Sequence, residues 1–372
     1  MTDALVTEVE QTVDAYLARS YDSERRLTLA ECHGWDPAFL DEIDDLGWFA
    51  LAVPESADGV GLPLSAVGAA MLSLGRHLVP GPLVERLLLP ALLLRHIDPG
   101  EPPRHDLPGA LVALVDPAAN GTWSVDDDGV RMESGGLVGG MLPVRFGQEA
   151  DQLLTVAESA GELVVYLLPP RGPGIDVEPV ASADPTARLA RVTFTEPAGA
   201  GITPVLTGSA AERFVAELRA WARILAACEL SGIATRLVED TTAFVQARQQ
   251  FGRPIGSFQA VKHTLADMYA LARSLRNLCD AALEDAGASS AEDLPMLAAV
   301  TKAYAAEAAV GVCESAIQMH GGAGFTTETD LHLYYKRALA LRGWYGDHEE
   351  LVHRIGDALL AGSGRTGPGD VS

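Results

Sequence analysis

The stretch RQQFGRPIGSFQ, residues 248–259, lies between two long helical patterns. Apolar residues recur with helical spacing from Ser209 to Gln250 and again from Gln259 to Ala286. The Gly-Arg-Pro sequence between them predicts a tight turn, because neither glycine nor proline sustains a helix. We therefore expect two helices joined by a compact connection that carries Arg248.

A second glycine-rich stretch, QMHGGAGF at residues 318–325, ends the helical pattern that runs from Ala291 to Met319. Glycine lets a backbone approach a ligand closely, and the Gln318 amide has the groups to bind the edge of a heterocycle. The planar fork of Arg248 matches a diphosphate better than a lysine would. From the residues alone, the two stretches are either ligand-binding segments or plain turns between helices.

The rest of the chain divides by pattern. Helical periodicity covers residues 1–100, with a Pro/Gly loop at 52–64 and a stop at 98–100. Residues 105–205 carry short apolar runs between turns, and Asp-Gly at 128–129 and Ala-Gly at 160–161 are typical of hairpin connections. The remaining expected helices are 36–46, 65–78, 83–97, 331–343 and 348–361, and the expected strands are 111–115, 130–132, 153–156, 163–168 and 190–194.

These patterns predict an α+β fold in four parts. We expect an N-terminal helical domain (1–104), a middle antiparallel β domain (105–206), a C-terminal four-helix bundle (207–362) and a disordered tail (363–372).

The composition excludes several kinds of function. The 372 residues include 27 Lys+Arg and 51 Asp+Glu, a net charge of −24, so no nucleic-acid partner is expected. No apolar run reaches about 18 residues and no secretory signal is visible, so we expect no membrane span and a cytoplasmic protein. His348 and His353 are five residues apart, which is not the spacing of a helical zinc site, and no metal is expected.

The spacing of the two glycine-containing stretches resembles the acyl-CoA dehydrogenase family. The shared pattern is Arg-x-x-Phe-Gly-x-Pro-Ile with a glutamine eleven residues after the arginine, and then Gln-x-x-Gly-Gly-x-Gly-Phe. The loop LAVPESADGVGLPL at 51–64 and the order of helical, β and four-helix domains are also similar. The resemblance covers nearly the whole chain, to about residue 360.

The resemblance implies FAD as the cofactor and an acyl-CoA as the substrate. In that family each FAD lies across a subunit boundary. One subunit's β domain holds the flavin ring, and the neighbour's two motifs hold the diphosphate and adenine. The positions that correspond to these FAD-binding motifs are Arg248, Gln250, Phe251 and Gln259 in the first stretch, and Gln318, Gly321 and Gly322 in the second.

The chain departs from the family at the catalytic base. Family members remove the α-proton of the thioester with a glutamate, and this requires a desolvated carboxylate with a raised pKa. The two family positions of that glutamate correspond here to Tyr345, within residues 344–347 (WYGD), and to Ala222, twenty-nine residues before Phe251. Neither is a carboxylate, so no catalytic residue is expected in this chain.

The middle domain departs as well. VALVDPAANGTW, residues 112–123, stands in place of the family's Thr-Glu-Pro-Gly-x-Gly-Ser-Asp. Residues 141–144 (MLPV) stand in place of Trp-Ile-Thr-Asn. The family segments supply hydroxyls and an indole to the flavin ring, so their loss predicts a degenerate ring pocket in this subunit.

This combination resembles the non-catalytic β subunit of actinobacterial α2β2 acyl-CoA dehydrogenases, heterotetramers of cholesterol side-chain β-oxidation. It implies a homologous catalytic partner, a steroid CoA thioester such as 3-oxocholest-4-en-26-oyl-CoA, and an electron-transferring flavoprotein as acceptor. Two alternatives stay open. One is a self-sufficient homomeric dehydrogenase with a displaced base at Asp347, Glu349 or Glu229. The other is a flavin-free scaffold subunit.

Overall fold

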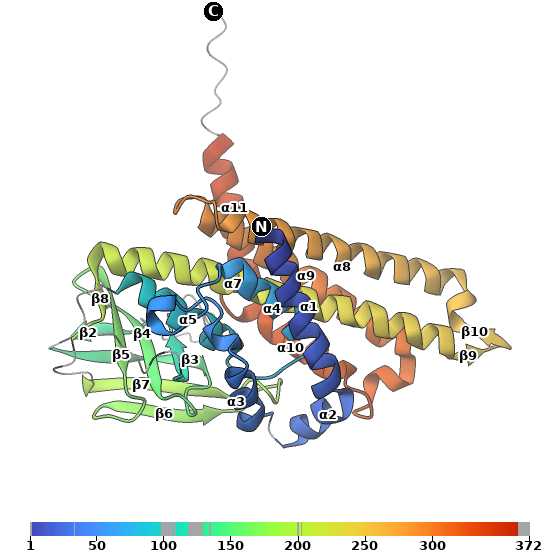
Figure 1. Cartoon of the computed structure of the whole chain (residues 1–372), viewed down its shortest axis with the longest axis horizontal. Helices are drawn as coiled ribbons and strands as arrows, with labels where there is room; N and C mark the ends of the chain where they lie inside the picture. Colours follow the sequence, from blue (N-terminus) through green and yellow to red (C-terminus); the bar gives the residue numbers. More distant parts are fainter. Residues whose placement is uncertain are drawn as a thin grey trace, which may run out of the picture.

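The computed structural model describes residues 2–32, 34–97, 107, 109–117, 129–133, 135–198, 201 and 203–363. Figure 1 shows a β-sheet at one end of the molecule and a long helical bundle that extends away from it. The order of helices, sheet and helices confirms the predicted α+β fold. Residues 364–372 of the expected tail lie outside the described residues.

The N-terminal part is helical, as predicted. Asp22 and Asp36 start two of its helices, because their side chains accept hydrogen bonds from the Arg25 and Phe39 amides. The patterns predicted α3, α4 and α5 but no separate bounds for α1 and α2. The elements are α1 (Thr2–Ser20), α2 (Ser23–Glu31), α3 (Pro37–Asp45), α4 (Leu64–Arg76) and α5 (Leu83–His96), with the 3-10 turns η1 (Trp48–Ala50) and η2 (Glu55–Ala57).

The C-terminal part is the helical bundle. Its helices are α7 (Gly208–Ala247), α8 (Gln259–Ala286), α9 (Leu294–His320), α10 (Leu331–Gly343) and α11 (His348–Ser363). Short elements connect them: β9 (Gln249–Gln250), β10 (Arg253–Pro254), η3 (Ile255–Ser257) and η4 (Gly321–Phe325). The bounds predicted for α8 and α10 are confirmed. Helix α7 ends before the predicted residue 250, because Arg248 adopts an extended conformation with φ −70° and ψ 124°.

Helix α9 occupies the centre of the bundle. The segment Leu294–Gly324 is long and apolar enough to cross a membrane by length and composition alone. However, 67% of its most apolar window is buried inside the protein. An apolar helix surrounded by other helices is expected in a folded core.

Helices α4 and α7 cross with their backbones in direct contact. A Cβ added to Gly75 of α4 would lie 2.2 Å from the Glu229 carbonyl oxygen, and one added to Gly232 of α7 would lie 2.1 Å from the Leu72 carbonyl oxygen. Nothing larger than a hydrogen atom fits at either position. The crossing therefore holds the N-terminal helices directly against the bundle.

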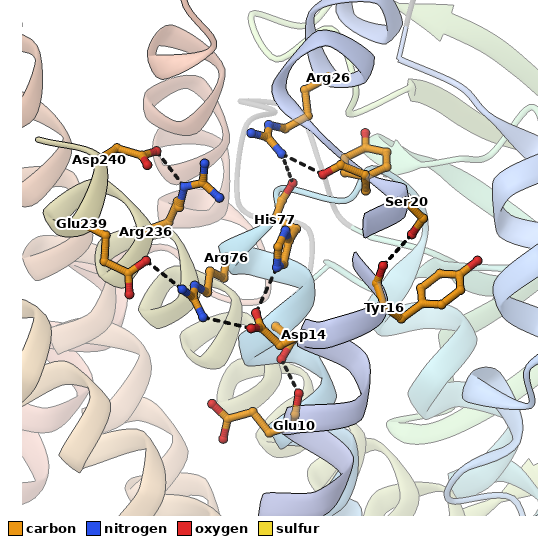
Figure 2. A network of polar contacts seen from close by, with 12 residues as sticks. Glu10, Asp14, Tyr16, Ser20, Arg26, Arg76, His77, Arg236, Glu239 and Asp240 are labelled. Carbon is orange, nitrogen blue, oxygen red and sulfur yellow. Dashed lines mark hydrogen bonds and ion pairs between the residues drawn. The ribbon is translucent and has the colours of Figure 1, made fainter. Parts of the chain in front are cut away.

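Charged side chains add to this attachment (Figure 2). Arg76 at the end of α4 donates to Asp14 of α1 at 3.1 Å and to Glu239 of α7 at 2.8 Å. His77 Nε2 lies 2.9 Å from the other Asp14 oxygen. Burial outweighs the neighbouring Asp14 carboxylate and lowers the pKa of His77. Helix α1 is thus linked to α4 and α7 through ion pairs.

The middle part is a single sheet in the order β6-β7-β3-β2-β4-β5-β8, with β1 beside β4. Most pairs are antiparallel, as predicted, but β1 and β2 both run parallel to β4. One face of the sheet joins the main hydrophobic core and the other has its own cluster. The strands are β1 (Val112–Val115), β2 (Arg131–Glu133), β3 (Gly136–Arg145), β4 (Gln152–Ser159), β5 (Glu162–Leu168), β6 (Ile175–Val180), β7 (Leu189–Ala198) and β8 (Leu206–Thr207).

The turn predictions have different outcomes. Ala160 and Gly161 connect β4 and β5 as a two-residue hairpin with φ of 52° and 85°, which confirms that prediction. At 128–129 the Asp128 position lies outside the described residues, and β1 and β2 on either side do not pair with each other in the described sheet.

In this sheet, strands β3, β6 and β8 were not predicted. Strand β3 contains Gly139, Gly140 and Pro143, residue types that weaken a strand pattern. Its pairing with β7 shifts register between Leu137 and Gly139 and again between Met141 and Val144, so bulges accommodate these residues. Strand β6 (IDVEPV) also contains a proline.

Candidate functional site

The stretch 248–259 folds into a short hairpin between α7 and α8. Phe251 and Gly252 form its turn with φ of 51° and 77°, the left-handed region that favours glycine. The Ile255 amide donates to the Arg248 carbonyl oxygen at 2.8 Å and closes the connection. The hairpin projects from the end of the bundle that lies farthest from the sheet (Figure 1).

The stretch 318–325 lies beside this hairpin. Gly321 follows the last residue of α9 with φ 58°, a left-handed position that suits glycine. The His320 ring stacks on Phe244 of α7, with 4.2 Å between centroids and 26° between planes. Because Phe244 lies one helical turn before Arg248, this contact brings the two predicted motifs together. We call residues 248–259 and 318–325 the clasp.

The polar groups of the clasp are available to a ligand. A Cβ added to Gly321 or Gly322 would meet no atom within 4 Å, so the backbone there is open. A guanidinium, several amides and an open backbone fit the phosphates and heterocycle of a dinucleotide. The exposed polar clasp side chains without a hydrogen-bond or ion-pair partner among the described residues are Arg248, Gln249, Gln250, Arg253, Gln259 and Gln318.

Phe251 is the most exposed large apolar side chain of the described structure, at 91%. The Phe258 ring meets it edge-on with centroids 6.2 Å apart, and the Arg253 guanidinium lies 4.1 Å from the Phe258 centroid. A phenyl ring held on a left-handed backbone position at the tip of a hairpin marks a contact surface.

The two family base positions lie in the interior instead. Ala222 is fully buried in α7, and Tyr345 after α10 is 1% exposed. The Tyr345 hydroxyl donates to Glu85 Oε1 at 2.7 Å and accepts a hydrogen bond from Arg145. Burial raises the pKa of Tyr345 well above its ordinary value, so its hydroxyl stays protonated. A phenol in this state does not act as a base near neutral pH.

Glu229, one candidate for a displaced base, forms an ion pair with an arginine. Arg337 of α10 donates to Glu229 at 2.8 Å and to Asp184 at 2.6 Å, and it also bonds Thr186. Burial opposes its charge, but Asp184 and Glu229 raise the pKa of Arg337 above its ordinary value. Likewise, Arg337 and Thr186 outweigh burial and hold the pKa of Asp184 below its usual range.

The other two candidates, Asp347 and Glu349, lie at the start of α11. The Glu349 amide donates to Asp347 Oδ1 at 2.9 Å, the geometry of a helix cap. Glu349 is exposed. Neither side chain joins the buried cluster around Tyr345, so the structure does not bring the three base candidates together.

The predicted ring pocket is only partly described. Residues 118–123, and the side chains of residues 141 and 142, lie outside the described residues. Pro143 borders a cavity of about 400 Å³ that is also lined by Leu189, Leu339 and Trp344. Pro143 itself has neither a hydroxyl nor an indole, but Ser182 and Trp344 also line that cavity. The degenerate ring pocket stays a prediction.

Sequence reasoning missed the charged residues around Tyr345. Glu85 follows Leu83 and Val84 and precedes an apolar run in α5, and Arg145 ends a largely apolar strand. Charged residues are rarely fully buried unless they are paired. A charge embedded in an apolar stretch was therefore a usable signal for the buried pairs.

Known proteins resemble this chain in sequence and in fold. The profile of the acyl-CoA dehydrogenase C-terminal domain matches residues 213–360. Acyl-CoA dehydrogenase IpdE2 of Mycobacterium tuberculosis is 33% identical over 331 residues, which cover 89% of each chain.

Two solved structures share the fold. Superposition of this chain on a chain of the ChsE4–ChsE5 complex of Mycobacterium tuberculosis gives a TM-score of 0.84 at 24% identity. The match covers 96% of this chain and 97% of that chain. In a variant of the steroid acyl-CoA dehydrogenase Tcur3481–Tcur3483 the TM-score is also 0.84 at 24% identity, with 98% and 100% covered.

Proposed function

The chain belongs to the acyl-CoA dehydrogenase family of FAD-dependent oxidoreductases, and we propose that it is the non-catalytic β subunit of an α2β2 member. In this proposal the chain contributes its clasp to an FAD. A homologous partner subunit contributes the catalytic glutamate and the pocket for the flavin ring. The observation that carries the proposal is the contrast between an open clasp and a base position occupied by the buried Tyr345.

Each part of the clasp has a role toward FAD. The Arg248 guanidinium would donate two parallel hydrogen bonds to the diphosphate. The Gln318 amide would bind the edge of the adenine, and the open backbone at Gly321 and Gly322 would let the cofactor lie close. Gln259 begins α8, so the positive end of that helix dipole would also face the phosphates.

The chemistry divides between the two subunits. Oxidation of the thioester removes a proton from the α-carbon and a hydride from the β-carbon, and bound FAD supplies the hydride acceptor. The proton needs a free carboxylate. Glu229 is held by Arg337, and Asp347 caps α11, which supports assigning the base to the partner. One complete site per pair then predicts one FAD for each αβ pair.

We propose a steroid side-chain CoA thioester as the substrate class. The motif pattern resembles dehydrogenases of cholesterol side-chain β-oxidation. The fold likeness to the ChsE4–ChsE5 complex and to a steroid acyl-CoA dehydrogenase supports the same direction. The product would be the α,β-unsaturated acyl-CoA, and an electron-transferring flavoprotein would reoxidise the cofactor.

Co-expression tests the proposal. The chain is purified alone and with its candidate partner, and flavin absorbance and oxidation of a steroid acyl-CoA by an artificial acceptor are measured. We expect turnover and one FAD per pair only in the complex. Turnover by the lone chain would favour the homomeric alternative. A stable complex without flavin would favour a scaffold subunit.

A further inference from the structure

The interior around Tyr345 joins three parts of the chain that are distant in sequence. Glu85 comes from α5, Arg145 from β3 and Tyr345 from the turn after α10, and each is at most 4% exposed. Arg145 Nη1 donates to the Tyr345 hydroxyl, which donates to Glu85. The guanidinium and Glu85 are themselves 3.6 Å apart, and Arg145 Nη2 donates to the Gly81 carbonyl at 3.3 Å.

The arginine in this cluster stays charged. Burial opposes the charge, but Glu85 and Tyr345 together raise the pKa of Arg145 above its ordinary value. Its guanidinium also lies 4.2 Å from the centroid of the Trp344 ring. Glu85 and Arg145 therefore form a buried ion pair with Tyr345 as a neutral bridge.

A second buried ion pair adjoins the first. Arg337 faces Asp184 and Glu229, and the charge on Glu229 also acts on Arg145 and Tyr345. Both arginines thus face carboxylates of this chain. These two sets of paired charges lie between the sheet, α5, α7 and α10. Buried Arg223 of α7 donates to the Tyr345 carbonyl oxygen at 3.0 Å and forms no ion pair among the described residues.

We infer that Arg145 and Arg337 form an ionic core with a structural role where the family keeps its catalytic base. This core closes the half-site, by which we mean the part of an active site that this chain would build around residue 345. The inference rests on the proposed function and says which residues keep the half-site closed. A catalytic carboxylate needs a pKa raised by desolvation, whereas an adjacent guanidinium lowers it. The surroundings of residue 345 are therefore unsuited to a base, whatever residue stands there.

The charges predict a specific pattern of stability. Removing Arg145 leaves Glu85 buried without a counter-ion, which is strongly unfavourable, whereas replacing both charged groups together is far less so. Protonation relieves an unpaired buried carboxyl, because its pKa is raised. The loss caused by removing Arg145 alone should accordingly shrink as the pH falls.

Thermal unfolding of the full chain tests the inference with Arg145→Met, Glu85→Gln and the double variant. We expect Arg145→Met to lower the midpoint by at least about 5 °C near neutral pH. The double variant should recover at least about half of that loss. The deficit of Arg145→Met should be smaller at about pH 5 than at about pH 8, while that of the double variant should not change in this way.

Other results would overturn the ionic core. Losses that simply add in the double variant would show that Arg145 and Glu85 are not coupled. A deficit of Arg145→Met that is independent of pH would exclude an unpaired carboxyl as its cause. If Arg145→Met does not fold, a folded double variant supports the inference and an unfolded one contradicts it. Because these readouts need neither flavin nor partner, they can fail while the β-subunit assignment stands.

Discussion

The centre of the molecule and the far end of the bundle use arginine in opposite ways. In the centre, Arg145 and Arg337 are buried and face carboxylates of their own chain. At the far end, Arg248 is exposed and has no such partner among the described residues. A buried guanidinium that its own chain neutralises belongs to the fold, whereas an exposed and unpaired one is available to a ligand. The comparison separates a structural core from a binding surface.

The largest effect should come from Arg248→Ala. Loss of charge-assisted hydrogen bonds to a diphosphate should weaken FAD binding by the complex about tenfold to a hundredfold. The lone chain should unfold at an unchanged temperature, because the Arg248 side chain makes no hydrogen bond or ion pair in the part of the chain that the structure describes. Flavin titration and thermal unfolding measure the two effects. Arg191→Ala, at an exposed position on β7, is the matched control, and an equal loss of FAD in that variant would contradict the assignment.

Lys302 is a buried cation, and replacing it tests how a buried charge changes the stability of the chain. It is fully buried, its Nζ is 3.4 Å from the Arg342 carbonyl oxygen, and burial together with Arg223 lowers its pKa to about 7. The unfolded chain keeps this proton up to the ordinary value of 10.5, so the destabilisation is fully present below about pH 7 and is relieved as the pH rises.

Lys302→Met should therefore raise the unfolding midpoint by a few degrees at about pH 7. The advantage over the wild-type chain should shrink by about pH 9.5, where the native lysine is neutral. Thermal unfolding of both proteins at the two pH values measures this. An advantage that is equal at both values would mean that the side chain's shape, not its charge, is responsible.

A smaller effect is expected for Phe251→Ala at the tip of the clasp. The lone chain should change in stability by no more than about 0.5 kcal/mol, because the ring is almost fully exposed. In the complex, FAD affinity or subunit affinity should fall by up to about tenfold. Val60→Ala, another exposed apolar position but in the N-terminal part, should change neither affinity. An unaltered complex with Phe251→Ala would remove this ring from the contact surface.

The smallest effect on turnover is expected for Tyr345→Phe. The substitution keeps the ring but removes the donor to Glu85, which should cost the lone chain about 1 kcal/mol of stability. Turnover of the complex should stay within about twofold of the wild type. Steady-state rates and unfolding measure both. A large rate loss would give Tyr345 a chemical role and would break the distinction between core and clasp.

Local signals account for what the sequence predicted well. Helix α8 has strong periodicity and follows a Gly/Pro turn, so its bounds were predicted correctly. The bounds of α10 were also predicted correctly, although its apolar residues are not gathered on one face. The two stretches of the clasp could be named from the sequence because each is contiguous, and their contacts with FAD stay a prediction. Their proximity depends on the contact between His320 and Phe244, which no spacing predicts.

The ionic core could not be assembled from the sequence. Glu85, Arg145, Arg337 and Tyr345 lie on separate elements, and only the folded chain brings them together. Strand β3 was missed for a related reason. Its glycines and proline oppose a strand locally, and bulges against β7 accommodate them in the sheet.

The crossing of α4 and α7 sets which positions a diverging gene can change. In the proposed β subunit the residues around Tyr345 take part in no reaction, so chemistry would not restrict them. Gly75 and Gly232 have no comparable freedom, because any side chain there would strike the opposite backbone. Under the proposal, a subunit of this family can lose its catalytic base and change its interior while the two glycines keep α4 and α7 in contact.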